Sequence, residues 1–420
     1  MRTFECTCGA RIFFDNTRCL SCQRELGFLS DQLLLTSLEP ATDGTFSTPF
    51  GNYKKCENYA EYGVCNWLVP ATETTQLCQA CRLNQVIPDL TNPENRQNWA
   101  NMEEAKRRLV YGLDRLRLPL VTKAEDPKRG LAFDIKADTE RERVLTGHDE
   151  GLITLNLGEA DTVTREQARI AMKERYRTLL GHFRHEVGHY YWERLVDDTK
   201  RHEEFRAVFG DERRDYGEAL KEHYSRQATA AWDPNFISFY AKSHPWEDWA
   251  ETFAHYLHMV DTLETAQHFG LAHRLPPRQS LPGVSDLDLL LLEWGELTIA
   301  LNSLNRSMGM PDPYPFAITD TVRNKLELVH RLIRERPTLL IGAEAEPTAP
   351  AAADAAAASA AADAAAAPLA APADAAAGAP VAAAPVAESP APPPVRAAAP
   401  AAKPQAPKAR AEAADVPARR

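Results

Sequence analysis

Two histidines and a glutamate lie within five consecutive residues, His185-Glu186-Val187-Gly188-His189, and could hold and use a metal ion. Residues at i and i+4 of a helix share one face, so both imidazoles could reach a single Zn²⁺. Glu186 lies beside them and could take a proton from a water that the metal has acidified, then pass it to a leaving amine. The pattern predicts hydrolysis of a peptide bond with Glu186 as general base.

An HExxH string also arises by chance, and its surroundings decide between the two interpretations. Apolar Phe183, Val187, Tyr190 and Leu195 recur around the motif. Their spacing predicts a packed helix rather than a loop, which favours a genuine metal site.

A catalytic zinc needs a third protein ligand, which leaves the fourth position for water. Residues 244–251, HPWEDWAE, open a helix after a proline and offer Glu247 and Glu251 at i and i+4. In gluzincins the ligand helix has the form ExxA or ExxS followed by a second acid, which hydrogen-bonds a ligand histidine. By that resemblance Glu247 is the ligand, and Glu251 is the second acid, which hydrogen-bonds one of the ligand histidines. The reverse assignment stays open, because a sequence does not fix the rotation of a helix.

Tyr240 is the candidate for stabilising the oxyanion. It precedes Glu247 by seven residues. Lethal-factor-type toxin metallopeptidases have a tyrosine at the same offset before their glutamate ligand, and this resemblance implies a phenol that stabilises the developing oxyanion. A buried structural tyrosine is the alternative. His244 and His223 are weaker candidates for the same role, and His255 and His258 are interpreted as packing or surface residues.

All the cysteines precede residue 82, in two quartets: Cys6, Cys8, Cys19 and Cys22, then Cys56, Cys65, Cys78 and Cys81. Four thiolates converging within about 2.3 Å of one ion are typical of structural zinc, and they leave no position open for water. The sequence thus predicts one catalytic and two structural Zn²⁺ ions. Disulfides and an iron–sulfur cluster are the alternatives. A reducing cytoplasm disfavours disulfides, and the ribbon-like spacing of the cysteines disfavours an iron–sulfur cluster. The CxC of the first quartet and the long gap from Cys56 to Cys65 leave the pairing of cysteines into sites open.

Composition limits where this chemistry can reside. The formal net charge of −11 disfavours nucleic acid as a partner, because no strongly basic field is present. The first residues do not show the basic stretch followed by an apolar stretch that is typical of a signal peptide, so we expect a cytoplasmic protein. No run of about 18 apolar residues occurs outside the tail, so we expect no membrane span. Residues 342–420 are almost entirely alanine and proline, which predicts a disordered tail.

The elements that must position these residues follow from hydrophobic spacing. Expected helices span 102–116, 182–196, 205–223, 246–267, 287–304 and 319–334, with a further helix from a capping box at 164–167 toward Leu180, interrupted at Gly181. Alternating residues predict strands at 131–135 and 153–157, the second of which would pair with an extended peptide substrate. Residues 305–316 are expected to connect two helices. The predicted fold is α+β and helix-rich with a small sheet, divided into a zinc-ribbon region (1–92), a zincin-like domain (93–341) and the tail (342–420).

Several motifs together resemble a bacterial family of zinc-binding metallopeptidases that join zinc ribbons to an HExxH domain. They are CGARIFFDNTRCLSC, CNWLVP with CQACRLNQVIPDL, GLITLNLGEAD, GHFRHEVGHYYWERL, HPWEDWAETFAHYLH and NRSMGMPDPYPF. The resemblance covers residues 1–341 and implies a fold and a metal, but no substrate. It favours a peptidase acting on peptides or proteins. The alternative is a zinc-ribbon module that binds a protein or nucleic acid, with the zincin domain as an inactive scaffold; the ribbons would also be the site for a protein partner.

Overall fold

Short antiparallel strands form the amino-terminal region of the computed structural model, which describes residues 2–139, 143–162, 165, 178–226, 233–272 and 285–335. One pair is β1 (Thr3–Glu5) with β2 (Arg11–Phe13), and another is β3 (Leu26–Leu29) with β4 (Leu34–Ser37). A four-stranded sheet follows, from β5 (Glu39–Pro40), β6 (Phe46–Thr48), β7 (Gly51–Lys55) and β8 (Leu68–Pro70), with the short helix α1 (Glu57–Ala60) before β8. Each cysteine lies in or beside the turns of this region.

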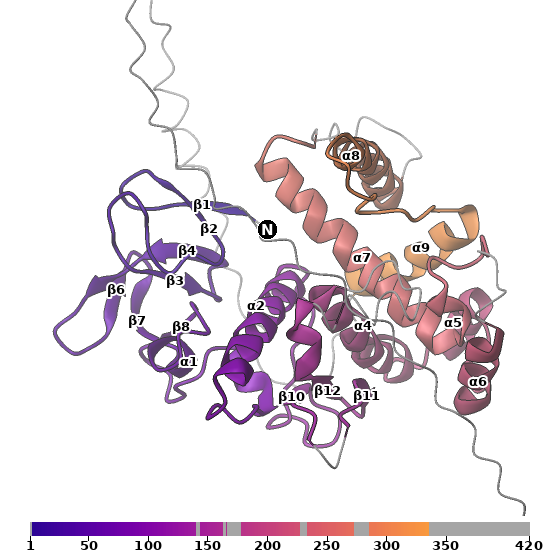
Figure 1. Ribbon diagram of the computed structural model, residues 1–420, viewed down its shortest axis with the longest axis horizontal. Helices are drawn as coiled ribbons and strands as arrows, with labels where there is room; N and C mark the ends of the chain where they lie inside the picture. Colours follow the sequence, from indigo (N-terminus) through magenta and orange to yellow (C-terminus); the bar gives the residue numbers. More distant parts are fainter. Residues whose placement is uncertain are drawn as a thin grey trace, which may run out of the picture. The chain divides into compact units, whose positions relative to one another are not determined.

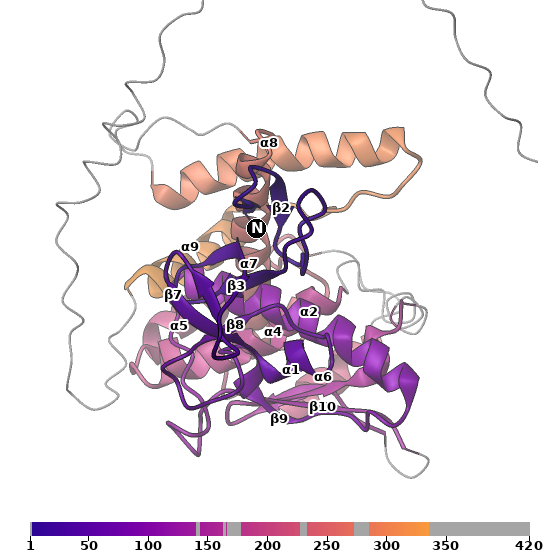
Figure 2. The same cartoon turned by 90° about the vertical axis from the view of Figure 1, so that its left-hand side faces the viewer.

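Helices dominate the rest of the chain. The α-helices are α2 (Pro93–Arg115), α4 (Leu179–Trp192), α5 (His202–Phe209), α6 (Tyr216–Arg226), α7 (Pro245–His268), α8 (Asp286–Ser307) and α9 (Asp320–Glu335). Short helical turns are η1 (Cys81–Leu83), η2 (Leu157–Ala160), η3 (Glu193–Asp197) and η4 (Tyr240–Lys242). Figures 1 and 2 both place α2 and α4 between the small sheet and α8. The predicted helix-rich α+β class is confirmed, whereas the expected tail lies outside the described residues.

The small sheet has the order β11-β12-β10-β9, from β9 (Asn84–Val86), β10 (Ala132–Lys136), β11 (Gly147–Asp149) and β12 (Leu152–Asn156). Strand β10 pairs in parallel with β9 and β12, and β11 runs antiparallel at one edge. The strand expected at 153–157 is therefore internal, and its interpretation as the strand that pairs with substrate is wrong. Among the described residues, the strands at the two edges of this sheet are β9 and β11, and β11 has three residues, too few for an alternating pattern to reveal.

Two helix predictions also need correction. The helix expected at 205–223 is divided into α5 and α6, because the chain turns at Gly210, whose φ of 97° is a conformation that favours glycine. Gly181 does not interrupt a helix but lies in the first turn of α4, where its N–H is bonded to the hydroxyl of Thr178 at 2.9 Å. The helix expected from 164 toward 180 falls mainly on residues outside those described.

Helices α4 and α7 pack closely along their lengths, as Figure 1 shows. Gly188 permits this, since a Cβ there would lie 3.0 Å from the Cα and 3.2 Å from the carbonyl oxygen of Ala250. The indole of Trp249 donates to the carbonyl of Gly188 at 2.9 Å, and Tyr191 stacks on Phe253 with ring centroids 5.4 Å apart. Small residues at the crossing and aromatic residues beside it fix the separation of the two helices.

The amino-terminal region shares its core with α2. Phe14 and Phe28 contact Tyr111 of α2, with ring centroids 5.2 and 6.0 Å apart, and Trp67 packs on Phe28. At the far end of α7, the Arg2 guanidinium lies 3.1 Å from the buried carboxylate of Glu264. Both α2 and α7 are thus in contact with the ribbon region.

Within the described part of the chain, no helix is both long and apolar enough to cross a membrane.

We expect Gly188→Ala to destabilise the protein by about 1–3 kcal/mol, because the added methyl group meets backbone atoms of Ala250 that cannot move aside. Urea-induced unfolding measures the change. Gly295→Ala is the matched control, since nothing lies within 4 Å of a Cβ there in α8 and alanine favours a helix. A Gly188→Ala variant as stable as the Gly295→Ala variant would show that the helices tolerate a wider separation.

Candidate metal centre

His185 and His189 lie on the buried face of α4. The helix begins at Thr178, whose hydroxyl accepts the N–H of Gly181, and it continues without a break through both histidines. Their ring centroids are 4.9 Å apart, as expected for i and i+4 residues directed to one point. Phe183, on the same helix, packs on Phe133 of the sheet, which holds α4 against the strands.

Glu247 comes from the first turn of α7. His244 caps this helix by accepting the N–H of Trp246, and Pro245 occupies its first position, so the helix start is well defined. One carboxylate oxygen of Glu247, Oε2, lies 3.0 Å from Nε2 of His185 and 3.4 Å from Nε2 of His189. One ligand atom from each of these three buried residues lies within 4.8 Å of the other two, so the three could bind one ion.

Glu251 takes a different position from Glu247. Its carboxylate lies 2.8 Å from Nδ1 of His185, on the side of the ring away from the other two ligand atoms. A proton held on Nδ1 by this carboxylate leaves the lone pair of Nε2 directed at the carboxylate of Glu247. A buried carboxylate that faces two imidazole nitrogens needs either a proton or a metal cation between them. The donor set therefore fits Zn²⁺, with Glu251 as the partner of His185 rather than a ligand.

Glu186 is held by a histidine that the sequence interpretation missed. Nε2 of His182, one turn earlier on α4, lies 3.3 Å from Oε1 of Glu186, and its Nδ1 is bonded to Glu159 in η2. Burial raises the pKa of Glu186, but the hydrogen bond from His182 and the nearby imidazoles bring it below its ordinary value. Burial lowers the pKa of His182, yet the charges of Glu159 and Glu186 raise it to about 9. Glu186 is thus kept ionised and able to accept a proton.

Two tyrosines approach the site. The ring of Tyr240, in η4, lies 5.8 Å from that of His185. Tyr216, the first residue of α6, was not predicted, although its hydroxyl donates to Oε1 of Glu247 at 2.6 Å. No spacing in the sequence connects Tyr216 with a glutamate 31 positions later. The contact depends on the turn between α5 and α6.

The edge strand contributes His148, a third residue that the sequence interpretation missed. Its ring lies 6.1 Å from that of His189 and 6.2 Å from the indole of Trp246, which covers His189 at 4.0 Å. The N–H of Gly151 donates to Nε2 of His148, and burial lowers the pKa of this histidine to about 3. A neutral imidazole and an indole therefore flank His189 on the side of β11.

Three other candidate histidines, His223, His255 and His258, have structural contacts. His223 packs on Phe239, with ring centroids 4.8 Å apart. His255 is bonded to the hydroxyl of Tyr314 at 2.9 Å, and His258 stacks on the same ring. Tyr314 belongs to the 305–316 segment, which connects α8 to α9 as expected. His255 and His258 are packing residues.

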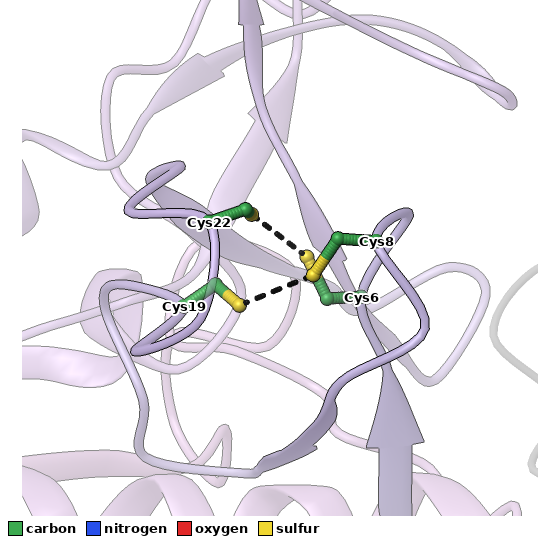
Figure 3. Close-up of side chains that lie close together, drawn as sticks. All are labelled: Cys6, Cys8, Cys19 and Cys22. Atoms are coloured by element: carbon green, nitrogen blue, oxygen red, sulfur yellow. Dashed lines mark hydrogen bonds between the residues drawn. The ribbon is translucent and has the colours of Figure 1, made fainter.

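The first cysteine quartet comes together at the turns after β1 and β2 (Figure 3). The sulfur atoms of Cys6 and Cys22 are 3.6 Å apart, and those of Cys8 and Cys19 are 3.7 Å apart. Four thiolates at about 2.3 Å from a tetrahedral ion would be about 3.8 Å from one another, so the group fits zinc without rearrangement. The N–H of Arg24 lowers the pKa of Cys22 to about 6, which favours the thiolate that a metal needs.

The second quartet is fully buried and lies against α2. The sulfur of Cys65 is 3.8 Å from that of Cys78 and 3.7 Å from that of Cys81, and the fourth member is Cys56. Burial opposes a charge on Arg107 of α2, but the thiols of Cys65 and Cys81 are among the groups that raise its pKa. A buried arginine beside four thiolates offsets their charge. The two quartets are therefore separate, each composed of cysteines adjacent in the sequence.

Comparison with known proteins identifies the family. A family model described as "Putative zinc-binding metallo-peptidase" matches residues 95–332, and a zinc-ribbon domain model matches residues 3–92. The chain belongs to this zinc-binding metallopeptidase family and carries a zinc-ribbon domain at its amino terminus.

Relatives in two mycobacteria match most of this chain over almost their whole length. An uncharacterized protein of Mycobacterium tuberculosis (strain ATCC 25618 / H37Rv) is 42% identical over 339 residues, covering 80% of this chain and 96% of the relative. An uncharacterized protein of Mycobacterium bovis has the same identity and coverage. No solved structure gives a significant match.

We expect Cys81→Ser to lower the free energy of unfolding by more than about 4 kcal/mol, because it removes a ligand from a buried site that contacts α2. Cys8→Ser is the matched control: Cys8 is exposed, so its loss should cost less. Urea-induced unfolding of the zinc-loaded proteins compares them. Equal losses would show that burial against α2 gives the second quartet no larger structural role than the first.

Proposed function

We propose that this protein is a zinc-dependent peptidase in which His185, His189 and Glu247 hold the catalytic Zn²⁺ and each cysteine quartet holds a structural one. The observation that supports it most strongly is the convergence of two imidazole nitrogens and one carboxylate oxygen from α4 and α7 on one buried point. When bound, Zn²⁺ supplies a Lewis acid that polarises a carbonyl group and lowers the pKa of water.

Glu186 performs the proton transfers. It accepts a proton from the attacking water, and it delivers that proton to the nitrogen of the scissile bond as the amine leaves. His182 contacts Glu159 through Nδ1 and Glu186 through Nε2, and these two contacts keep the Glu186 carboxylate directed toward the site. The Tyr240 phenol, on the His185 side, stabilises the charge that develops on the carbonyl oxygen.

Substrate aligns along β11. This strand lies at one edge of the sheet in the described residues and faces α4, and the ring of its His148 lies 6.1 Å from that of His189. An extended peptide can therefore add its main-chain hydrogen bonds to the sheet beside the metal ligands. The same geometry suits proteins with an exposed, unfolded segment as substrates.

A second function, recognition of a protein partner, is favoured by the surface of the first ribbon. Leu20, between Cys19 and Cys22, is 86% exposed, whereas Phe13 is 47% exposed and its ring stacks on that of Phe269. An exposed apolar side chain beside the quartet is suited to protein contact. This surface would recruit a substrate or partner without taking part in hydrolysis.

We expect Glu186→Gln to lower kcat by a factor of about 10² or more, because the amide cannot accept the proton. Zinc content should be unchanged, since the substitution leaves the ligands in place. Cleavage of a broad peptide library, followed by mass spectrometry, measures the loss, and Glu203→Gln on the surface of α5 is the matched control. Cleavage at the same sites and rates by the Glu186→Gln variant would contradict its role as base.

A further inference from the structure

The two carboxylate oxygens of Glu247 have different partners. Oε2 faces Nε2 of His185 at 3.0 Å and of His189 at 3.4 Å, whereas Oε1 accepts the hydroxyl of Tyr216 at 2.6 Å. The side chain of Glu247 is 2% exposed, so bulk water does not compete for either oxygen. The carboxylate is therefore divided between one side directed at the metal position and one side held by a phenol.

Tyr216 is placed to hold this orientation. Its ring lies 5.3 Å from that of His244, the cap of α7, and 6.0 Å from that of Trp246, both in edge-to-face contacts. These two residues flank the start of the helix that carries Glu247. The phenol is thus packed against the same helical turn whose carboxylate it contacts, and Tyr216 as a whole is 39% exposed.

A free carboxylate rotates and can present one or both of its oxygens to a cation. A donor fixed on one oxygen restricts that rotation, and outer hydrogen bonds of this kind strengthen metal binding. Glu251 does the equivalent for His185 by bonding its Nδ1. Tyr216 thus supplies for the third ligand what Glu251 supplies for the first.

We propose that Tyr216 is the positioning residue of Glu247: its hydroxyl holds Oε1 and so presents Oε2 to the ion beside the two histidines. The inference rests on the proposed metal site, but it concerns zinc affinity rather than hydrolysis. It assigns α6 a role in the site, through its first residue.

The test compares zinc retention in the full-length, zinc-loaded protein and in Tyr216→Phe. Each is titrated with the chelator pyridine-2,6-dicarboxylate, and the zinc left on the protein is measured after desalting. His189→Ala identifies the zinc that depends on this site, and the cysteine-bound zinc reports whether each variant is folded. Tyr256→Phe is the matched control, because it removes a hydroxyl of α7 that is bonded to His330, away from the ligands.

We expect Tyr216→Phe to lose the His189-dependent zinc at about ten- to a hundredfold lower chelator activity than the parent, while Tyr256→Phe behaves like the parent. A change of less than twofold in Tyr216→Phe would overturn the inference. So would a lower kcat with unchanged zinc affinity, because the hydroxyl would then act on the substrate.

The same experiment separates this inference from the proposed function. A Tyr216-dependent zinc in a protein that cleaves no peptide supports the positioning role and contradicts the peptidase. A parent protein without any His189-dependent zinc contradicts both.

Discussion

The close crossing of α4 and α7 is the constraint on which the site depends. The proposed metal ligands are divided between the two helices, and the gap between the helices must remain small for a carboxylate on one to reach imidazoles on the other. Gly188 and Ala250 supply that closeness, and the bond from Trp249 to the carbonyl of Gly188 fixes the register of the crossing. The glycine within the HExxH sequence thus has a packing role of its own, beside residues that have chemical ones.

Groups around the proposed ligands contact each side chain of the candidate site. Glu251 orients His185, Tyr216 holds Glu247, and the His182–Glu159 pair holds Glu186. These partners come from α6, α7, η2 and α4 itself, so the site draws together elements distant in the sequence. A buried group of charges is stable under such conditions because each charge has a partner of opposite sign or a donor. The ribbon region supports the same helices through its contacts with Tyr111 of α2 and Glu264 of α7.

The local features of this structure could be predicted from the sequence, whereas contacts between residues far apart in the chain could not. The spacing of His185 and His189, the helix signals around Glu247 and the grouping of the cysteines all depend on neighbours within a few turns of chain. The edge strand β11 was missed because three residues are too few to show alternation, so substrate pairing was assigned to β12, which is internal in the sheet. Tyr216 is brought to Glu247 by a turn at Gly210, and such tertiary contacts leave no periodic signal. The choice between Glu247 and Glu251 required the rotation of α7, which packing against α4 determines.

The most direct test of the metal centre is anomalous X-ray diffraction at the zinc absorption edge, from crystals of the purified zinc-loaded protein. We expect an anomalous peak bounded by Nε2 of His185, Nε2 of His189 and a carboxylate oxygen of Glu247, in addition to one peak within each cysteine quartet. A protein with zinc in the quartets but no peak between α4 and α7 would contradict the assignment of these residues as a metal site. A peak bound by Glu251 in place of Glu247 would contradict the ligand set.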